Sequence, residues 1–163
     1  TNTKKRLYFA CPTDYPETVI NNTFRQENYF YSSLGNSIIF NLSTIRQIEK
    51  VIREKSIQEI VFVLSNDNCI VLDGLENQDF LDVKGLTNFC RKITKQKEYS
   101  ELSWQTTNRQ FLVLSYHLNE KIQELRCKLR DELKVSSKIY DWQTQNFTDI
   151  YADSICQEQA ILN

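Results

Sequence analysis

Residues 57–65, IQEIVFVLS, decide the fold of this 163-residue chain. The unbroken apolar run at residues 60–64 leaves the segment without a polar face. Such a run is typical of a strand that is buried on both sides, as in parallel sheets covered by helices. We therefore predict an α/β protein in which this strand lies inside a mainly parallel sheet flanked by helices.

The chain before this strand contains two further strand-like segments. Residues 6–11 and 28–33 are short runs rich in strand-forming side chains, and Pro12 ends the first of them. Residues 34–36, Leu-Gly-Asn, form a turn, and residues 37–40 are expected to be a brief extended piece or the entry to a helix.

Helical patterns fill the intervals between these strands. Residues 16–26 begin with a proline at a first-turn position, and residues 43–55 place apolar side chains on one face behind an N-cap at Ser43. Because strands and helices alternate, the connections are predicted to be right-handed crossovers between parallel strands.

The second half of the chain adds two helices and a hairpin. Residues 78–97 and 109–134 carry apolar side chains at helical spacing, the second over an unusually long seam. Residues 138–142 and 147–152 are expected to pair as a C-terminal hairpin across the polar turn at 143–146.

Length, charge and histidine content limit the classes of function. The chain suits one domain over residues 1–163, and its net charge of −1 argues against nucleic acid or an anionic membrane as partners. No apolar run approaches the roughly 18 residues that span a bilayer. The single histidine, His117, excludes a zinc site with several histidines, and its place in the long helix predicts a surface or interface residue.

The cysteines are Cys11, Cys69, Cys90, Cys127 and Cys156, at wide spacings and without a CxxC pair. This pattern predicts free thiols in a reducing compartment, so we expect a cytoplasmic protein. Cys90 and Cys127 lie on the apolar faces of the expected helices and are predicted to be core side chains. Cys11 and Cys69 end or follow apolar runs, near the carboxyl ends of strands where ligands bind in parallel sheets.

The strand ends resemble those of the β-class carbonic anhydrases. That family's first strand ends in Cys-x-Asp-x-Arg, its second near Arg-Asn-Ala-Gly-Asn and its third in Gly-His-x-x-Cys-Gly. The corresponding segments of this chain are, in the same order, LYFACPTDY (7–15), YSSLGN (31–36) and IVFVLSNDNC (60–69). A fourth segment, KIYDWQTQNF (138–147), resembles the family's late hairpin. The resemblance implies a β-carbonic-anhydrase-like sheet and a homodimer formed through the sheet edge and surrounding helices.

The family's zinc ion is held by two cysteines and one histidine. By position, the resemblance places the cysteines at Cys11 and Cys69 and the histidine at Asn66. A neutral amide is a poor ligand for zinc compared with imidazole or thiolate, so we expect no cofactor. As a weaker alternative, Asp14 or Asp67 completes a zinc site with the two cysteines.

The family's Asp–Arg dyad is also changed. Its positions fall on Thr13 and Tyr15, and the arginine of the second motif falls on Ser32, whereas Gly35 keeps the glycine of the turn. Asp14 lies one residue after the position of the family's aspartate, and no arginine follows it. It is the remaining candidate for a catalytic residue in this motif.

These differences predict a non-catalytic relative of the family, a pseudoenzyme with a binding or structural role toward a ligand that the sequence does not identify. Tyr15 and Ile70 are expected to fill part of the remnant pocket. The residues of that pocket are Cys11, Thr13, Tyr15, Ser32, Gly35, Asn66 and Cys69.

Two alternatives stay open. The first is a metalloenzyme or thiol enzyme rebuilt around Cys11 and Cys69, with carbonic-anhydrase-type lyase activity if zinc is retained. The second is an unrelated α/β domain that binds a small ligand or a protein.

Overall fold

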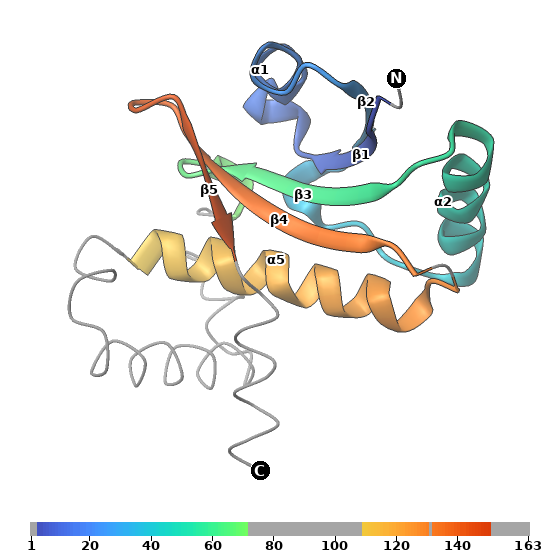
Figure 1. The fold of residues 1–163 in the computed structure, drawn as a ribbon. Helices are drawn as coiled ribbons and strands as arrows, with labels where there is room; N and C mark the ends of the chain where they lie inside the picture. The colour runs from blue at the N-terminus through green and yellow to red at the C-terminus, as the bar shows by residue number, and fades with distance from the viewer. Residues whose placement is uncertain (1–2, 72–108, 131, 151–163) are drawn as a thin grey trace, which may run out of the picture.

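The computed structural model describes residues 3–71, 109–130 and 132–150. A five-stranded sheet forms its centre, in the order β2-β1-β3-β4-β5 (Figure 1). β1 to β4 pair in parallel, and β5 pairs antiparallel with β4 as the predicted hairpin. The mainly parallel sheet is therefore confirmed. The strands are β1 (Lys5–Ala10), β2 (Glu27–Ser32), β3 (Glu59–Ser65), β4 (Lys134–Asp141) and β5 (Asn146–Ile150).

Helices lie on both sides of the sheet. α5 (Arg109–Lys128) crosses one face, and α1 (Pro16–Thr23) lies on the opposite side (Figure 1). Side chains of α5 and α2 (Leu42–Lys55) share the larger core cluster with one face of the strands, and Ile20 of α1 joins a smaller cluster on the other face. Every residue of β3 is buried, as predicted for a strand covered on both faces.

Two helix boundaries differ from the predicted ones on the amino-terminal side. α1 ends at Thr23 rather than at 26, because Phe24 has an extended backbone and its ring packs against Tyr8. The N-cap of α2 is Asn41 rather than Ser43, since the Asn41 side chain accepts a hydrogen bond from the Thr44 N–H at 2.9 Å.

The long helix is shorter than predicted. α5 ends at Lys128 instead of 134, because residues from Lys134 onward pair with β3 and the Arg126 guanidinium donates to the Val135 carbonyl oxygen at 2.8 Å. The prediction that Cys127 is a core side chain is wrong: it is exposed, on the side of α5 away from the buried Leu125. Cys90, Cys156 and the helix expected at 78–97 lie outside the described residues.

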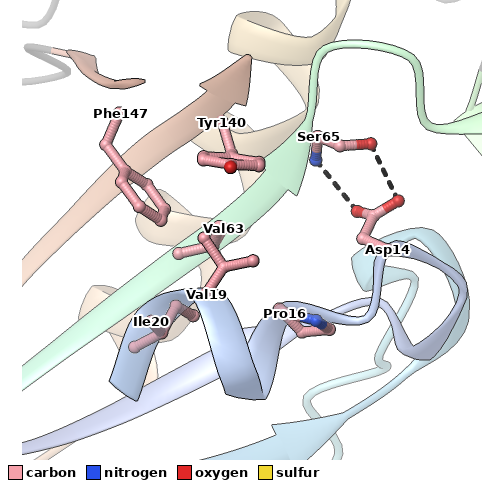
Figure 2. A pocket seen from close by; sticks show the side chains of 8 residues that line it. All are labelled: Asp14, Pro16, Val19, Ile20, Val63, Ser65, Tyr140 and Phe147. Carbon is pink, nitrogen blue, oxygen red and sulfur yellow. Dashed lines mark hydrogen bonds between the residues drawn. The ribbon is translucent and has the colours of Figure 1, made fainter. Parts of the chain in front are cut away.

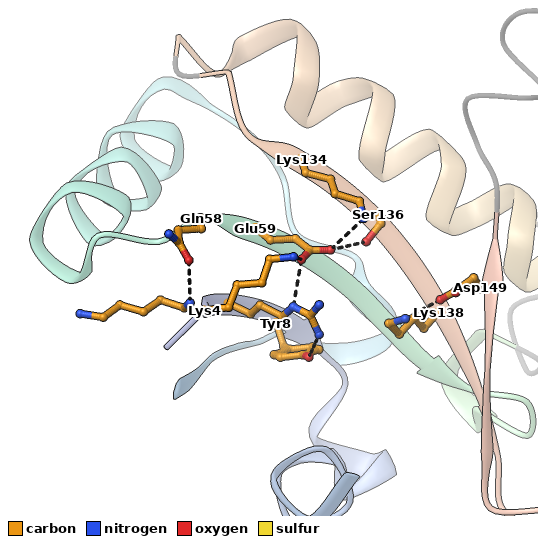
Figure 3. Close-up of polar contacts among 10 residues, drawn as sticks. Lys4, Tyr8, Gln58, Glu59, Lys134, Ser136, Lys138 and Asp149 are labelled. Carbon is orange, nitrogen blue, oxygen red and sulfur yellow. Dashed lines mark hydrogen bonds and ion pairs between the residues drawn. The ribbon is translucent and has the colours of Figure 1, made fainter. Parts of the chain in front are cut away.

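Glu59, at the amino end of β3, ties three strands together. Its carboxylate lies 2.9 Å from Arg6 Nε, 3.3 Å from Lys4 Nζ and 3.7 Å from Lys134 Nζ, although its side chain is only 4% exposed (Figure 3). Burial works to raise the pKa of Glu59, but the positive charges of Arg6, Lys134 and Lys4 outweigh it and hold the pKa below its usual range.

No helix among the described residues combines the length and hydrophobicity that crossing a bilayer requires.

The Glu59 cluster leads to a stability prediction. Glu59→Gln should lower the free energy of unfolding by about 2 to 3 kcal/mol at pH 7, because it removes the buried charge that Arg6 and the two lysines face. Because the folded-state pKa of Glu59 is depressed, its ionised carboxylate stabilises the protein at pH values above the unfolded-state pKa of about 4.3. This contribution is lost as the pH falls through the folded-state pKa. The difference between the two proteins should therefore shrink in acid, as measured by urea unfolding.

Glu54→Gln is the matched control, because Glu54 is exposed on α2 and its carboxylate lies 3.8 Å from the Nζ of the exposed Lys50. It should change stability by less than about 0.5 kcal/mol. Equal effects of the two substitutions would contradict the role of Glu59.

Candidate functional site

The loops that follow β1, β2 and β3 meet at the carboxyl edge of the sheet. After Cys11, Pro12 starts a short 3-10 turn over Pro12–Asp14, which brings Asp14 back toward the end of β3. Tyr15 follows with a left-handed backbone at φ 48°, and α1 then begins at Pro16. This path separates Asp14, which turns inward, from Tyr15, which turns outward.

Asp14 is held by the end of β3 and the loop after it. Its side chain accepts hydrogen bonds from the Ser65 backbone N–H at 2.9 Å, the Ser65 hydroxyl at 2.8 Å and the Asn68 amide at 2.9 and 3.0 Å. Asp14 is 8% exposed. Both of its carboxylate oxygens are therefore occupied, and these partners are neutral groups.

Figure 2 shows Asp14 and Ser65 at one end of a small cavity and Ile20 and Phe147 at the other. Its volume is about 10 Å³, close to that of a single water molecule. Such a space is too small for a substrate.

A second carboxylate competes for the same hydroxyl. Asp67 Oδ1 also lies 2.8 Å from Ser65 Oγ, and a hydroxyl has only one hydrogen to donate. Asp67 is exposed, so water can solvate it, whereas the buried Asp14 cannot lose its partners without cost. The Ser65 hydroxyl is therefore assigned as a donor to Asp14.

The sulfur of Cys11 is enclosed. Cys11 is 0% exposed, its Sγ accepts the Gly35 N–H at 3.1 Å, and Thr13 Oγ1 lies 3.0 Å away. Gly35 has φ +60°, and a Cβ placed there would meet Ile70 Cγ2 at 2.9 Å. The turn thus needs glycine both for its backbone and for the close approach of Ile70.

The two large side chains expected in the remnant pocket, Ile70 and Tyr15, lie in different surroundings. Ile70 packs directly over Gly35, the residue that binds the Cys11 sulfur. Tyr15 is 79% exposed and lines, together with Ser32, an open hollow of about 250 Å³ at the carboxyl ends of β1 and β2.

The remaining predicted residues differ in exposure and in their hydrogen-bond partners. Cys69 is exposed, and its thiol lies 3.7 Å from the Asp67 carbonyl oxygen. Asn66 is half-buried and donates its backbone N–H to the Tyr140 carbonyl oxygen, while Ser32 is exposed at the end of β2. Within residues 3–71, 109–130 and 132–150, no three His, Cys, Asp or Glu side chains come close enough to hold a metal ion.

The candidate zinc ligands lie in different surroundings. One thiol is enclosed by the protein's own hydrogen bonds, the other is exposed, and the position of the family's histidine carries a neutral amide.

His117 is the residue that sequence reasoning placed wrongly. It is buried, not on the surface, and its Nε2 lies 2.6 Å from the Gly35 carbonyl oxygen. Burial lowers the pKa of His117 below its usual value. The Lys121 charge adds to this effect, while the carbonyl groups of Gly35 and Asn36 and the charge of Glu124 oppose it. Its position one turn from Leu114 and next to Leu118, both buried, was the available signal.

The five-stranded order, the hairpin edge and the loops at the carboxyl edge define a β-carbonic-anhydrase-like fold, and solved structures of that class match it. The chain aligns with CafD, a β-carbonic anhydrase of Aspergillus fumigatus, at 14% identity over 93% of this chain and 91% of that one, with a TM-score of 0.63. It aligns with a tetrameric β-carbonic anhydrase of Sordaria macrospora at 15% identity over 92% and 82%, with a TM-score of 0.58.

A carbon disulfide hydrolase is similar as well, at 14% identity over 91% of this chain and 79% of that one, with a TM-score of 0.54. The chain matches no protein-family model, and no curated protein matches it significantly in sequence. At these identities, the likeness establishes the fold and leaves the function to the side chains of the site.

The hydrogen bonds of Asp14 give a second prediction. Asp14→Asn replaces one acceptor oxygen with an NH₂ group that faces donors, and should lower the free energy of unfolding by about 2 kcal/mol. Asp67→Asn, the matched control, should change it by less than about 0.5 kcal/mol, because Asp67 is exposed and the Ser65 hydroxyl already serves Asp14. Urea unfolding of both variants checks this, and an equal loss in both would refute the assignment.

The buried imidazole gives a pH prediction. Because the folded-state pKa of His117 is lowered, its neutral form stabilises the protein above the unfolded-state value of about 6.5, and this contribution is lost as the pH falls through the folded-state pKa. The free energy of unfolding of the native chain, relative to His117→Gln, should therefore decline between pH 7.5 and pH 5. A difference that stays constant over this range would show that His117 does not titrate as described.

Proposed function

We propose that this chain is a β-carbonic-anhydrase-like protein without the family's catalysis, with a binding or structural role as a homodimer. The supporting observation is the state of the Cys11 sulfur. The Gly35 N–H and the Thr13 hydroxyl surround it, and Ile70 lies over the turn that supplies the N–H. Side chains thus occupy the surroundings in which the family's first zinc thiolate would need an open coordination site.

The carboxylate nearest to the family's dyad supports the same proposal. General acid–base work requires a carboxylate that can reach a substrate or a water molecule. Asp14 is buried, and its two oxygens accept hydrogen bonds from Ser65 and Asn68. Its role in this proposal is to hold the loop after β1 against the end of β3.

The homodimer is carried over from the family resemblance, and the tetrameric Sordaria macrospora enzyme is an assembly of similar chains. The ligand class is left open, because the small cavity beside Asp14 does not specify one.

Elemental analysis tests this proposal directly. The full chain, purified without chelator or histidine tag, should contain well under one zinc ion per chain and should not accelerate carbon dioxide hydration. Asn66→His should raise the zinc content, because imidazole would replace the neutral amide. Combining it with Ile70→Gly should raise it further by clearing the space over Gly35.

Gln47→His is the matched control, since it adds a histidine to the exposed face of α2. It should leave the zinc content unchanged. One zinc ion per native chain, together with carbon dioxide hydration, would overturn the proposal and favour the site rebuilt around Cys11 and Cys69.

A further inference from the structure

Residues 35–40, which we call the strap, run between the turn after β2 and the start of α2. Three side chains of α5 bind the carbonyl oxygens of this strap. His117 Nε2 lies 2.6 Å from Gly35 O, Lys121 Nζ donates to Ile38 O at 2.9 Å, and Lys128 Nζ donates to Phe40 O at 2.6 Å. A carbonyl oxygen only accepts, so the His117 ring nitrogen carries the hydrogen.

The order of these donors matches the strap. Positions 117, 121 and 128 lie along one side of a helix, and the 11 residue steps from first to last rise about 16 Å. The five steps from Gly35 to Phe40 reach at most about 18 Å when extended, and less here because Gly35 and Asn36 have left-handed backbones. The donors therefore follow the order of the carbonyl groups, and the strap lies along α5 rather than crossing it at one point.

The strap also covers Cys11. Its first residue, Gly35, donates its N–H to the Cys11 sulfur, which is 0% exposed. Ile38 and Phe40 are buried, and the Lys121 ammonium lies 5.8 Å from the centre of the Phe40 ring. Ile39, between them, is 75% exposed. Anything that reaches the sulfur from this side must first displace the strap.

The strap is held differently from the sheet beside it. Residues 37–41 belong to no helix or strand, and the contacts with α5 described here are made by individual side chains, two of them flexible lysines. The strap shares the core of the sheet, because Ile38 and Phe40 are buried in the same cluster as the strands and the Asn36 amide donates to the Val63 carbonyl oxygen at 2.9 Å. It has no hydrogen-bonded ladder, however, and segments without a ladder open at a lower free energy than strands that have one.

We propose that the strap is a gate over the Cys11 thiol. Its detachment from the donors of α5, together with the withdrawal of the Ile38 and Phe40 side chains from the core, exposes the sulfur while the five-stranded sheet stays folded. The sulfur is thus reached through a local opening, and α5 sets how often that opening occurs. This inference is independent of the proposed loss of catalysis, because a gate of this kind controls access to Cys11 whether or not the site performs chemistry.

Alkylation of the native full chain by iodoacetamide tests the gate. The reagent forms a carbon–sulfur bond and releases iodide, and mass spectrometry of peptides reports the rate at each cysteine separately. Cys11 should react at least about 100-fold more slowly than the exposed Cys69. If the gate opens locally, low concentrations of urea should barely change the Cys11 rate. A rate that rises with urea as steeply as global unfolding would overturn the proposal.

Variants of α5 test which contacts hold the gate. Lys121→Met and Lys128→Met keep much of the aliphatic stem and remove the donor, and together they should raise the Cys11 rate about tenfold. Lys50→Met, on the exposed face of α2, is the matched control and should leave the rate unchanged.

His117 has its own pair of variants. His117→Ala should also raise the Cys11 rate, whereas His117→Gln, whose amide can donate to the Gly35 carbonyl oxygen, should raise it less. If the variants of His117, Lys121 and Lys128 leave the Cys11 rate as unchanged as Lys50→Met does, the proposal is overturned. If the variants fail to fold, the urea dependence of the native chain still decides it.

Discussion

The complete burial of β3 is the constraint on which the rest of this structure depends. A strand with no exposed residue needs covering on both faces, and the helices on the two sides of the sheet supply it. It also buries the polar residues at the two ends of the strand, which then need partners. Glu59 finds cations from β1 and β4, and Ser65 gives its N–H and hydroxyl to Asp14. Both polar clusters therefore follow from one apolar run.

The two clusters act at opposite edges of the sheet. At the amino edge, the charge of Glu59 joins three neighbouring strands, so it stabilises the sheet itself. At the carboxyl edge, Asp14 joins a loop to a strand end, and Gly35 joins a second loop to Cys11. These loops are fastened by hydrogen bonds within the chain. Substitutions at the carboxyl edge can therefore alter the site while the amino edge keeps the strands in register.

The sequence predicts the fold well because its main signals are local. The apolar run of β3, the alternating segments before it and the hairpin after it each depend on neighbouring residues. The site depends on contacts between distant positions, which periodicity does not report. Asn68 meets Asp14, and His117 meets Gly35, across 54 and 82 residues of sequence. The end of α5 was missed for a related reason, because pairing with β3 overrides a helical pattern that continues past Lys128.

Solved structures with a similar fold include carbonic anhydrases and a carbon disulfide hydrolase, so the fold alone does not determine the reaction. In this chain the carboxyl edge is filled by the protein's own loops and side chains. The buried His117 imidazole beneath the strap donates to the Gly35 carbonyl oxygen, and the N–H of the same residue donates to the Cys11 sulfur. A long helix on one face of the sheet is thereby connected to a thiol at its edge through a single glycine. Since that glycine has no room for a side chain beside Ile70, a substitution there would disturb the contact with α5 and the contact with the thiol together.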